Sequence, residues 1–129
     1  MTTIEPTVRE AIDVTVGQYA DGLRNGDVAL LREAFKPTAV VCGYIDTELY
    51  VKDLDFLCQF VAETPSPASQ GEPYACETTS VEVHGGVAVV TVAERHYVQY
   101  DYVTSLHLVV EDGRWWIVSK LFNGTPSPS

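Results

Sequence analysis

The stretch YDYVTSLHLVVEDGRWWIVSKLF, residues 100–122, decides the fold. Two runs rich in valine, leucine and aromatic residues flank Asp112-Gly113, and this composition is typical of β-strands. Both central positions of a type I′ turn need a positive φ, which Asp and Gly tolerate. We therefore predict an antiparallel hairpin made of strands Tyr100–Glu111 and Arg114–Phe122.

Two further strands are predicted before this hairpin. The segments Tyr74–Val83 and Val87–Tyr97 are rich in valine, threonine and tyrosine, and Gly85-Gly86 between them is typical of a two-residue turn. The connection from Tyr97 to Asp101 contains neither Gly nor Pro, so its boundary is the least well defined. The second half of the chain is predicted to be a four-stranded meander.

The first half of the chain has a helical period instead. Apolar residues at three- and four-residue steps predict an amphipathic helix that ends at Asn25-Gly26, and these residues are Val8, Ile12, Val16, Tyr19 and Leu23. Asp27 is typical of the N-cap of a second helix, which Pro37 ends. The remaining predicted elements are a strand at Ala39–Tyr44, a return at Glu48–Val51, a helix at Asp53–Ala62, a loop at 64–73 and a flexible tail at 123–129.

Helices collected before a long meander indicate the α+β class, with three N-terminal helices packed on a strongly curved antiparallel or mixed sheet. We expect a single domain over residues 1–129, with its core at about residues 7–122. Both alternating rows of the last strands are apolar or aromatic, with Tyr102, Leu106 and Leu108 in one row and Val103 and Val109 in the other. Since helices cover one face, we expect a second copy to cover the other in a homodimer.

The composition limits the classes of partner. Eighteen Asp and Glu against eight Lys and Arg give a net charge of −10, which argues against nucleic acid and anionic membranes as partners. No apolar run approaches the ~18 residues that span a bilayer, and no secretory signal is visible. Three widely spaced cysteines, Cys42, Cys58 and Cys76, indicate unpaired thiols in the cytoplasm. We expect no metal site and no cofactor.

Two sequence patterns, taken with this order of elements, resemble the nuclear transport factor 2-like superfamily. The first is Gln18–Leu23 with Gly26-Asp27 and Phe35–Ala39. The second runs from Asp101-Tyr102 through Ser105-Leu106 to Asp112–Phe122 and is similar to the lumazine-binding or SnoaL-like branch. The resemblance covers about residues 7–122. It implies a cone in which a bent sheet wraps a long helix, with a pocket between them and usually a dimer through the sheet.

The resemblance identifies the fold better than the activity, because this superfold hosts isomerases, dehydratases, cyclases and binding proteins. The branch commonly has Phe-His-Pro-Asp-Ala after the second helix, whereas this chain has Phe35-Lys36-Pro37-Thr38-Ala39. Two groups that could carry protons or bind a metal are therefore absent.

Ketosteroid isomerase, a well-understood relative of this fold, needs a carboxylate base and two hydrogen-bond donors. By resemblance, Tyr19 falls at the position of the donor tyrosine, Ser105 at that of the second donor, and Gly43 at that of the base. Because the base is missing, the isomerase mechanism cannot be carried over. Whether the protein is an enzyme stays open.

Strand alternation extends the candidate pocket around Ser105. Asp101, Val103 and His107 share its side of the strand. Counting alternate residues along the next strand from the turn at Gly113 places Val118, Lys120 and Phe122 on the same inner face. We expect a mostly apolar chamber lined by Tyr19, Asp101, Val103, Ser105, Val118, Lys120 and Phe122, with an Asp101–Lys120 ion pair. This assignment of side chains to the inner face assumes that no β-bulge lies between Asp101 and Gly113.

Three functional hypotheses follow. The first is a dimer that binds a small, mostly apolar or aromatic ligand in the chamber. The second is a cofactor-independent isomerase, dehydratase or cyclase that uses Asp101 or His107 as general base and Tyr19 as donor. The third is a structural or adaptor subunit with a filled interior. The residues also have purely structural interpretations: Tyr19 and His107 as satisfied core or interface groups, Asp101 and Lys120 as an ion pair at the cone mouth, and Glu94-Arg95-His96 as a charged strand edge.

Overall fold

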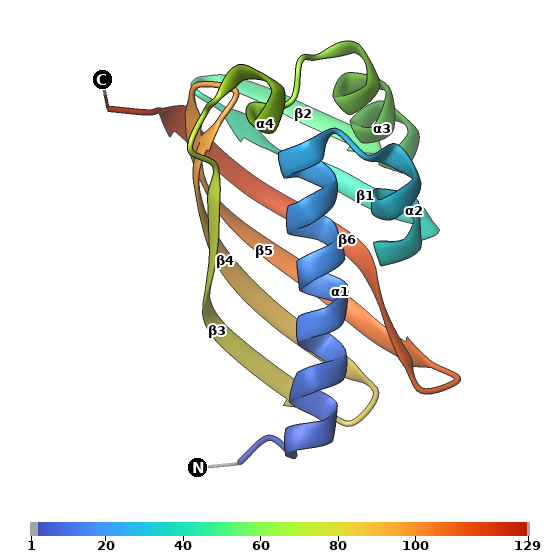
Figure 1. Ribbon diagram of the computed structural model, residues 1–129. Coiled ribbons are helices and arrows are strands. Elements are labelled where there is room, and N and C mark those ends of the chain that lie inside the picture. Colours follow the sequence, from blue (N-terminus) through green and yellow to red (C-terminus); the bar gives the residue numbers. More distant parts are fainter. Residues whose placement is uncertain (1–2, 129) are drawn as a thin grey trace.

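A long helix, α1 (Pro6–Asn25), lies across the concave side of a curved sheet (Figure 1). The computed structural model describes residues 3–128. Helix α1 ends at Gly26, whose φ of 67° is left-handed and whose N–H donates to the Gly22 carbonyl. Helix α2 (Val28–Ala34) begins at once, because the Asp27 carboxylate accepts the Leu30 N–H at 3.1 Å. These caps confirm the predicted junction.

The sheet has six strands and is mixed. Its order is β2-β1-β6-β5-β4-β3, with β1 and β6 parallel and every other neighbouring pair antiparallel. The α+β class with three helices on a curved sheet is therefore confirmed. The strands are β1 (Phe35–Ile45), β2 (Glu48–Asp53), β3 (Ala75–His84), β4 (Val87–Tyr97), β5 (Tyr100–Glu111) and β6 (Arg114–Pro126).

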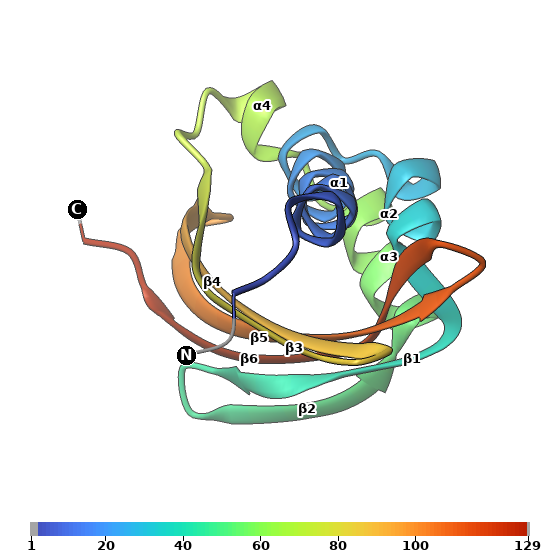
Figure 2. The same cartoon turned by 90° about the horizontal axis from the view of Figure 1, so that it is seen from below.

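The helices cover only the concave face of the sheet (Figure 2). Helix α3 (Leu54–Glu63) begins at Asp53, whose carboxylate accepts the Phe56 N–H at 3.0 Å. The core lies between α1 and the middle of the sheet, where α1 contributes Ile12, Tyr19 and Leu23 and the strands contribute Leu106, Leu108 and Ile117. All six side chains are at most 1% exposed. Burial of this apolar face is what holds the helix on the sheet.

Two segments differ from the expectation from sequence. A short helix, α4 (Pro67–Gln70), interrupts the expected loop at 64–73, since Ser66 caps the Ser69 N–H and Pro67 occupies the first turn. The expected tail is partly strand, because β6 continues to Pro126, which pairs with Tyr100. Strand β5 is long enough to offer backbone partners beyond Phe122. The last residue of the expected tail, 129, lies outside the described residues.

Two β-bulges change which side chains face the helices. In β6, Ser119 pairs with His107 and Ile117 with Leu108, so Val118 is an extra residue. In β4, the register shifts between Glu94 and Tyr97, and His96 has a φ of 56°. Because side chains alternate along a strand, one extra residue moves every later side chain to the other face. Both bulges lie next to the site described below.

Candidate functional site

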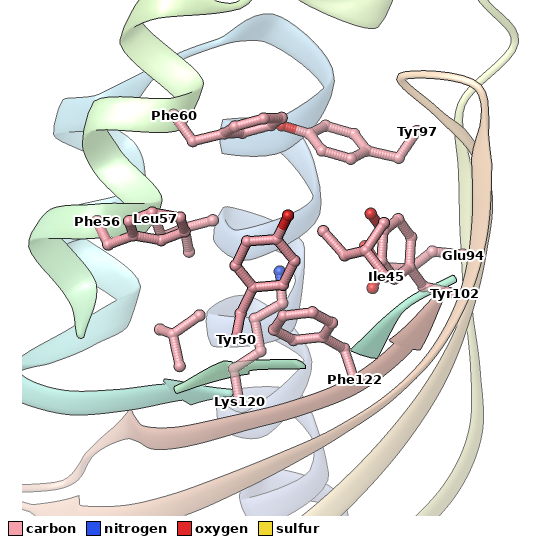
Figure 3. Close-up of a pocket in the computed structure, with 11 residues that line it drawn as sticks. Ile45, Tyr50, Phe56, Leu57, Phe60, Glu94, Tyr97, Tyr102, Lys120 and Phe122 are labelled. Carbon is pink, nitrogen blue, oxygen red and sulfur yellow. The ribbon is translucent and has the colours of Figure 1, made fainter. Parts of the chain in front are cut away.

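A cavity of about 180 Å³ opens between the sheet and α3 (Figure 3). Its wall is mostly apolar and rich in aromatic rings, and two charged groups, Glu94 and Lys120, complete it. The lining residues are Val41, Ile45, Tyr50, Phe56, Leu57, Phe60, Glu94, Tyr97, Tyr102, Lys120 and Phe122. An apolar chamber with a few polar groups is the usual form of a small-molecule site.

Glu94 is a buried carboxylate, 2% exposed, that is held by three hydroxyl groups. Tyr19 donates to Oε1 at 2.9 Å and Thr104 donates to the same oxygen at 2.7 Å. Tyr74 donates to Oε2 at 2.7 Å. Each carboxylate oxygen accepts about two hydrogen bonds, so Oε1 is fully used and Oε2 has one acceptor position left.

Burial and the charge of Glu94 act together on the tyrosines that contact it. Desolvation first, and then the Glu94 charge, raises the pKa of Tyr19 and the pKa of Tyr74 well above their usual value. Both hydroxyls therefore stay protonated and serve as donors to the carboxylate.

Lys120 is the second charged group of the pocket. Its side chain is 8% exposed, and Nζ lies 5.1 Å from the centre of the Tyr19 ring and 5.3 Å from that of Phe122. Burial lowers the pKa of Lys120, and the nearby Glu94 charge partly offsets this effect. Within residues 3–128, Nζ has no hydrogen-bond or ion-pair partner among the side chains. Figure 3 shows the amine directed into the space enclosed by the aromatic rings.

Aromatic rings form the walls and the mouth of the cavity. Phe60 contacts Tyr97 with ring centres 6.4 Å apart, and Tyr102 contacts Tyr97 at 6.4 Å and Phe122 at 5.9 Å. Tyr102 in turn lies over Gly124, where an added Cβ would come within 2.5 Å of the ring. Glycine at this position therefore lets the Tyr102 ring lie close to the sheet.

The turn beside Tyr97 is held by a carboxylate from outside the sheet. Val98 and Gln99 both have positive φ values, 49° and 71°, which disfavour residues other than Gly and Asn. Glu72 accepts the Val98 N–H at 2.9 Å and the Gln99 N–H at 2.7 Å. Two charge-assisted hydrogen bonds thus stabilise a turn that the sequence did not mark.

The structure brings together only some of the residues expected at the site. Lys120 and Phe122 line the cavity, whereas Tyr19 lies behind Glu94 and does not reach the wall. Asp101 and Val103 line a second, more open hollow with Ala93, Arg95, Asn123 and Thr125. Ser105 pairs with Leu121 on the face away from the helices, and Val118 is the extra residue of the β6 bulge.

The prediction of which β5 side chains lie opposite which β6 side chains was wrong because of that bulge. Without it, Ser105 would lie opposite Lys120; with it, Leu106 lies opposite Lys120 and Thr104 opposite Phe122. Asp101 consequently forms no ion pair with Lys120. Its carboxylate accepts from the Ser127 hydroxyl at 2.6 Å and the His96 N–H at 3.0 Å, and these two bonds lower its pKa. His107 is exposed on the outer face.

Gly43, at the position of the isomerase base, has no room for a side chain. An added Cβ would lie 1.9 Å from the carbonyl oxygen of Phe122, its neighbour on β6. A carboxylate could not be accommodated here without separating β1 from β6.

Sequence reasoning missed most of the pocket, Glu94 above all. Ala88, Val90 and Val92 form a buried row along β4, and Glu94 continues this row at the same two-residue spacing. A charged residue in a buried row was the available signal. No such signal exists in the sequence for Tyr97, because only the bulge at His96 turns this side chain inward. Phe56 and Phe60 lie just beside the buried stripe of α3 and are each 37% exposed.

The cysteines and the acidic groups form no metal centre within residues 3–128, where no three His, Cys, Asp or Glu side chains are placed to hold an ion. Cys76 lies opposite Glu94 on β3, and burial, followed by the Glu94 charge, raises the pKa of its thiol to about 12. It is therefore a poor nucleophile at neutral pH. No helix in the described part of the chain is long and apolar enough to cross a membrane.

Comparison with known structures supports the architecture. A protein of unknown function from Shewanella baltica aligns with a TM-score of 0.85 at 20% identity and covers 98% of this chain and 100% of its own. One from Silicibacter pomeroyi gives 0.84 at 23% identity, with 97% and 100% covered. Both are described as nuclear transport factor 2-like, and this is the fold of the present chain.

Sequence comparison places the chain more narrowly. Residues 7–123 match the model of the family described as "Putative lumazine-binding", so the chain belongs to this family. A curated protein named "Aldolase FrzH", from Cladobotryum sp, is 27% identical over 118 residues and covers 91% of each chain.

Proposed function

We propose that this protein binds a small, mostly apolar or aromatic molecule that carries a carbonyl or anionic oxygen. The single observation that carries the proposal is the Lys120 amine, which has no ionic or hydrogen-bond partner among the side chains of residues 3–128 and lies inside an aromatic-lined cavity. The rings would bury the apolar part of the ligand, and Nζ would donate to its oxygen. A cavity of about 150 Å³ is enough for benzene, so about 180 Å³ suits a compact ring with one short substituent.

The family description and the name of one relative agree with this ligand class. Lumazine is a flat heteroaromatic molecule with carbonyl oxygens, and aldol chemistry joins or splits carbonyl compounds. The cavity also argues against the hypothesis of a filled interior. The second hypothesis, an enzyme with Asp101 or His107 as base, loses its support because neither residue lines this cavity. Glu94 and Lys120 are the titratable groups that do.

Binding can be tested with simple probes and a matched pair of variants. We expect benzoate, benzyl alcohol or lumazine to raise Tm, by about 4 °C at ten times Kd for a chain of this size. Ile45→Trp should abolish the shift, since the indole would occupy the cavity. Tyr44→Trp places the same indole on the neighbouring, outward-facing position and should leave the shift intact. Absence of a saturable shift with all three probes, or equal loss in both variants, would refute the proposal.

We also propose that the protein is a homodimer through the outer sheet face. Exposed apolar side chains gather there, and they are Val40, Tyr44, Leu49, Val51, Val103 and Leu121, each 46–67% exposed. An apolar sheet face without covering helices is a typical self-association surface. Leu121→Lys should lower the molecular mass measured by light scattering to that of a monomer. Val14→Lys alters an equally apolar, 62% exposed position on α1 and should not. A monomeric wild type would refute this proposal.

A reducing compartment such as the cytoplasm is the location we propose. The absence of disulfides among Cys42, Cys58 and Cys76 supports it. Fractionation of the producing cells, with a thiol count on the purified protein, tests it; recovery of the protein in an oxidising compartment would contradict it.

A further inference from the structure

Lys120 differs from the other two lysines of the chain in its surroundings. Lys36 pairs with Glu111 at 2.6 Å, and Lys52 is exposed, with its amine 5.2 Å from the Phe56 ring. Lys120 is more than nine-tenths buried, has no ionic partner within the described residues, and lines the cavity. A buried amine without a carboxylate in direct contact is the lysine environment that favours the neutral, nucleophilic form.

Glu94 influences Lys120 electrostatically, and within the described residues no direct ion pair joins the two groups. Its three hydroxyl donors, from Tyr19, Tyr74 and Thr104, fix the carboxylate in place and satisfy three of its acceptor positions. One position on Oε2 is left. The pocket thus contains an amine and a proton acceptor that are neighbours without neutralising each other in a direct ion pair. This arrangement exceeds what plain ligand binding requires.

We infer that Lys120 condenses with the aldehyde or ketone group of the bound molecule to form an imine, with Glu94 carrying the protons. The inference rests on the proposed function, because the same cavity must first hold the carbonyl compound. The substrate class is a small aldehyde or ketone with an apolar or aromatic substituent that the rings around Tyr102 and Phe122 can bury.

The step balances without an oxidant or a cofactor. The Nζ lone pair attacks the carbonyl carbon, a C–N bond forms, and the carbonyl π pair moves to oxygen. One amine proton passes through Glu94 to that oxygen and gives a carbinolamine. The C–O bond then breaks, and the hydroxyl leaves as water with the second amine proton. The neutral imine then takes up one proton from solvent, relayed by Glu94, and the resulting iminium acidifies the adjacent C–H bond, which is the entry to aldol-type carbon–carbon chemistry.

Reductive trapping tests the inference on the unmodified protein. Benzaldehyde with sodium cyanoborohydride converts an imine into a stable secondary amine, which intact-mass measurement and peptide mapping locate. We expect the wild-type protein at neutral pH to be modified at Lys120 at least ~10-fold faster than at Lys36 or Lys52. Equal modification of the three lysines would overturn the inference.

Two variants sharpen the result. Lys120→Arg keeps a positive charge but cannot form the imine, so trapping in this peptide should disappear. Lys36→Arg is the matched control and should leave the Lys120 rate unchanged. If Lys120→Arg does not fold, the peptide map of the wild type still decides the question.

Benzyl alcohol separates the two proposals, because it matches benzaldehyde in size but cannot form an imine. Saturable binding of benzyl alcohol without preferential trapping at Lys120 would refute the imine and leave the binding function standing. If neither compound binds and no lysine is trapped preferentially, both proposals fail. Preferential trapping that benzyl alcohol suppresses by competition would support both.

Discussion

The two ends of the concave sheet face are built differently. Near the β5–β6 hairpin, aliphatic side chains interdigitate with α1, and Ile12, Leu108 and Ile117 are at most 1% exposed. At the other end, aromatic rings such as Phe60 and Tyr97, which contact each other, line a cavity. Both ends share the same strands. Branched aliphatic side chains fill the space between the helices and the sheet at the first end. At the second end, flat rings positioned by α3 and by the two bulges keep the helix and the sheet apart and leave a cavity.

The largest expected effect on stability comes from truncating an isoleucine to alanine, and its size should differ between the packed end and the pocket end of the concave face. Ile117→Ala at the packed end should lower the free energy of unfolding by about 4 kcal/mol, because it leaves a void among side chains that cannot close it. Ile45→Ala, on the half-buried wall of the cavity, should cost about 1 kcal/mol, since its surroundings are already open. Urea denaturation of both variants measures the comparison. Equal losses would mean that the pocket end is as tightly packed as the other.

The next effect concerns the two charged groups of the cavity. Glu94→Gln should cost about 3 kcal/mol, because it disturbs three buried hydroxyl bonds and removes the negative charge near Lys120. In a Lys120→Met background the same change should cost about 1.5 kcal/mol, because only the hydroxyl bonds, and no longer the interaction with the Lys120 amine, are then disturbed. A double-mutant cycle in urea gives both values. Strict additivity would show that the two groups do not interact.

A smaller effect is expected from a single hydroxyl. Tyr19→Phe removes one buried donor to Glu94 and should cost about 2 kcal/mol. Tyr50→Phe is the control, because its hydroxyl donates to Glu48 at the surface, at 3.1 Å, and its loss should change stability by less than about 0.5 kcal/mol. Thermal and urea unfolding of the pair test this. A larger loss for Tyr50→Phe would contradict the assignment of the buried network.

The packed end was largely predictable, whereas the pocket end was not. The helical period of Ile12, Val16 and Tyr19 and the turn at Asp112-Gly113 depend on local chemistry, and both were predicted correctly. Local chemistry also identified Asp27 as an N-cap. These signals need only a few neighbouring residues, so one sequence is enough to recognise them.

The pocket depends on features that local patterns do not encode. The bulge at Val118 contains no glycine or other marker, yet it decides whether Ser105 or Leu106 lies opposite Lys120. The prediction therefore assigned to the cavity the wrong alternating row of β5, and the sequence neighbours of the predicted residues face it instead. The turn at Val98 and Gln99 is likewise stabilised by Glu72, which is distant in the sequence. Register and long-range caps require the three-dimensional structure.

The smallest expected effect contrasts Asp101, on the open side of the sheet, with the buried Glu94. The Ser127 hydroxyl, and then the His96 N–H, lowers the pKa of Asp101. A carboxyl whose folded pKa lies below its unfolded value stabilises the fold above the unfolded pKa. That contribution is lost as pH falls through the folded pKa. Ser127→Ala removes the larger cause, so the pKa of Asp101 should rise toward the usual value of an aspartate.

NMR titration of the Asp101 carboxyl carbon measures this shift directly. Ser119→Ala, on the same strand as the β6 bulge and without a bond to Asp101, is the control and should leave the titration unchanged. Because Asp101 is only partly buried, we expect the change to be visible in the titration and small in overall stability. If Ser127→Ala leaves the titration of Asp101 unaltered, the hydroxyl bond is not what distinguishes this carboxylate, and the backbone donor at His96 must dominate.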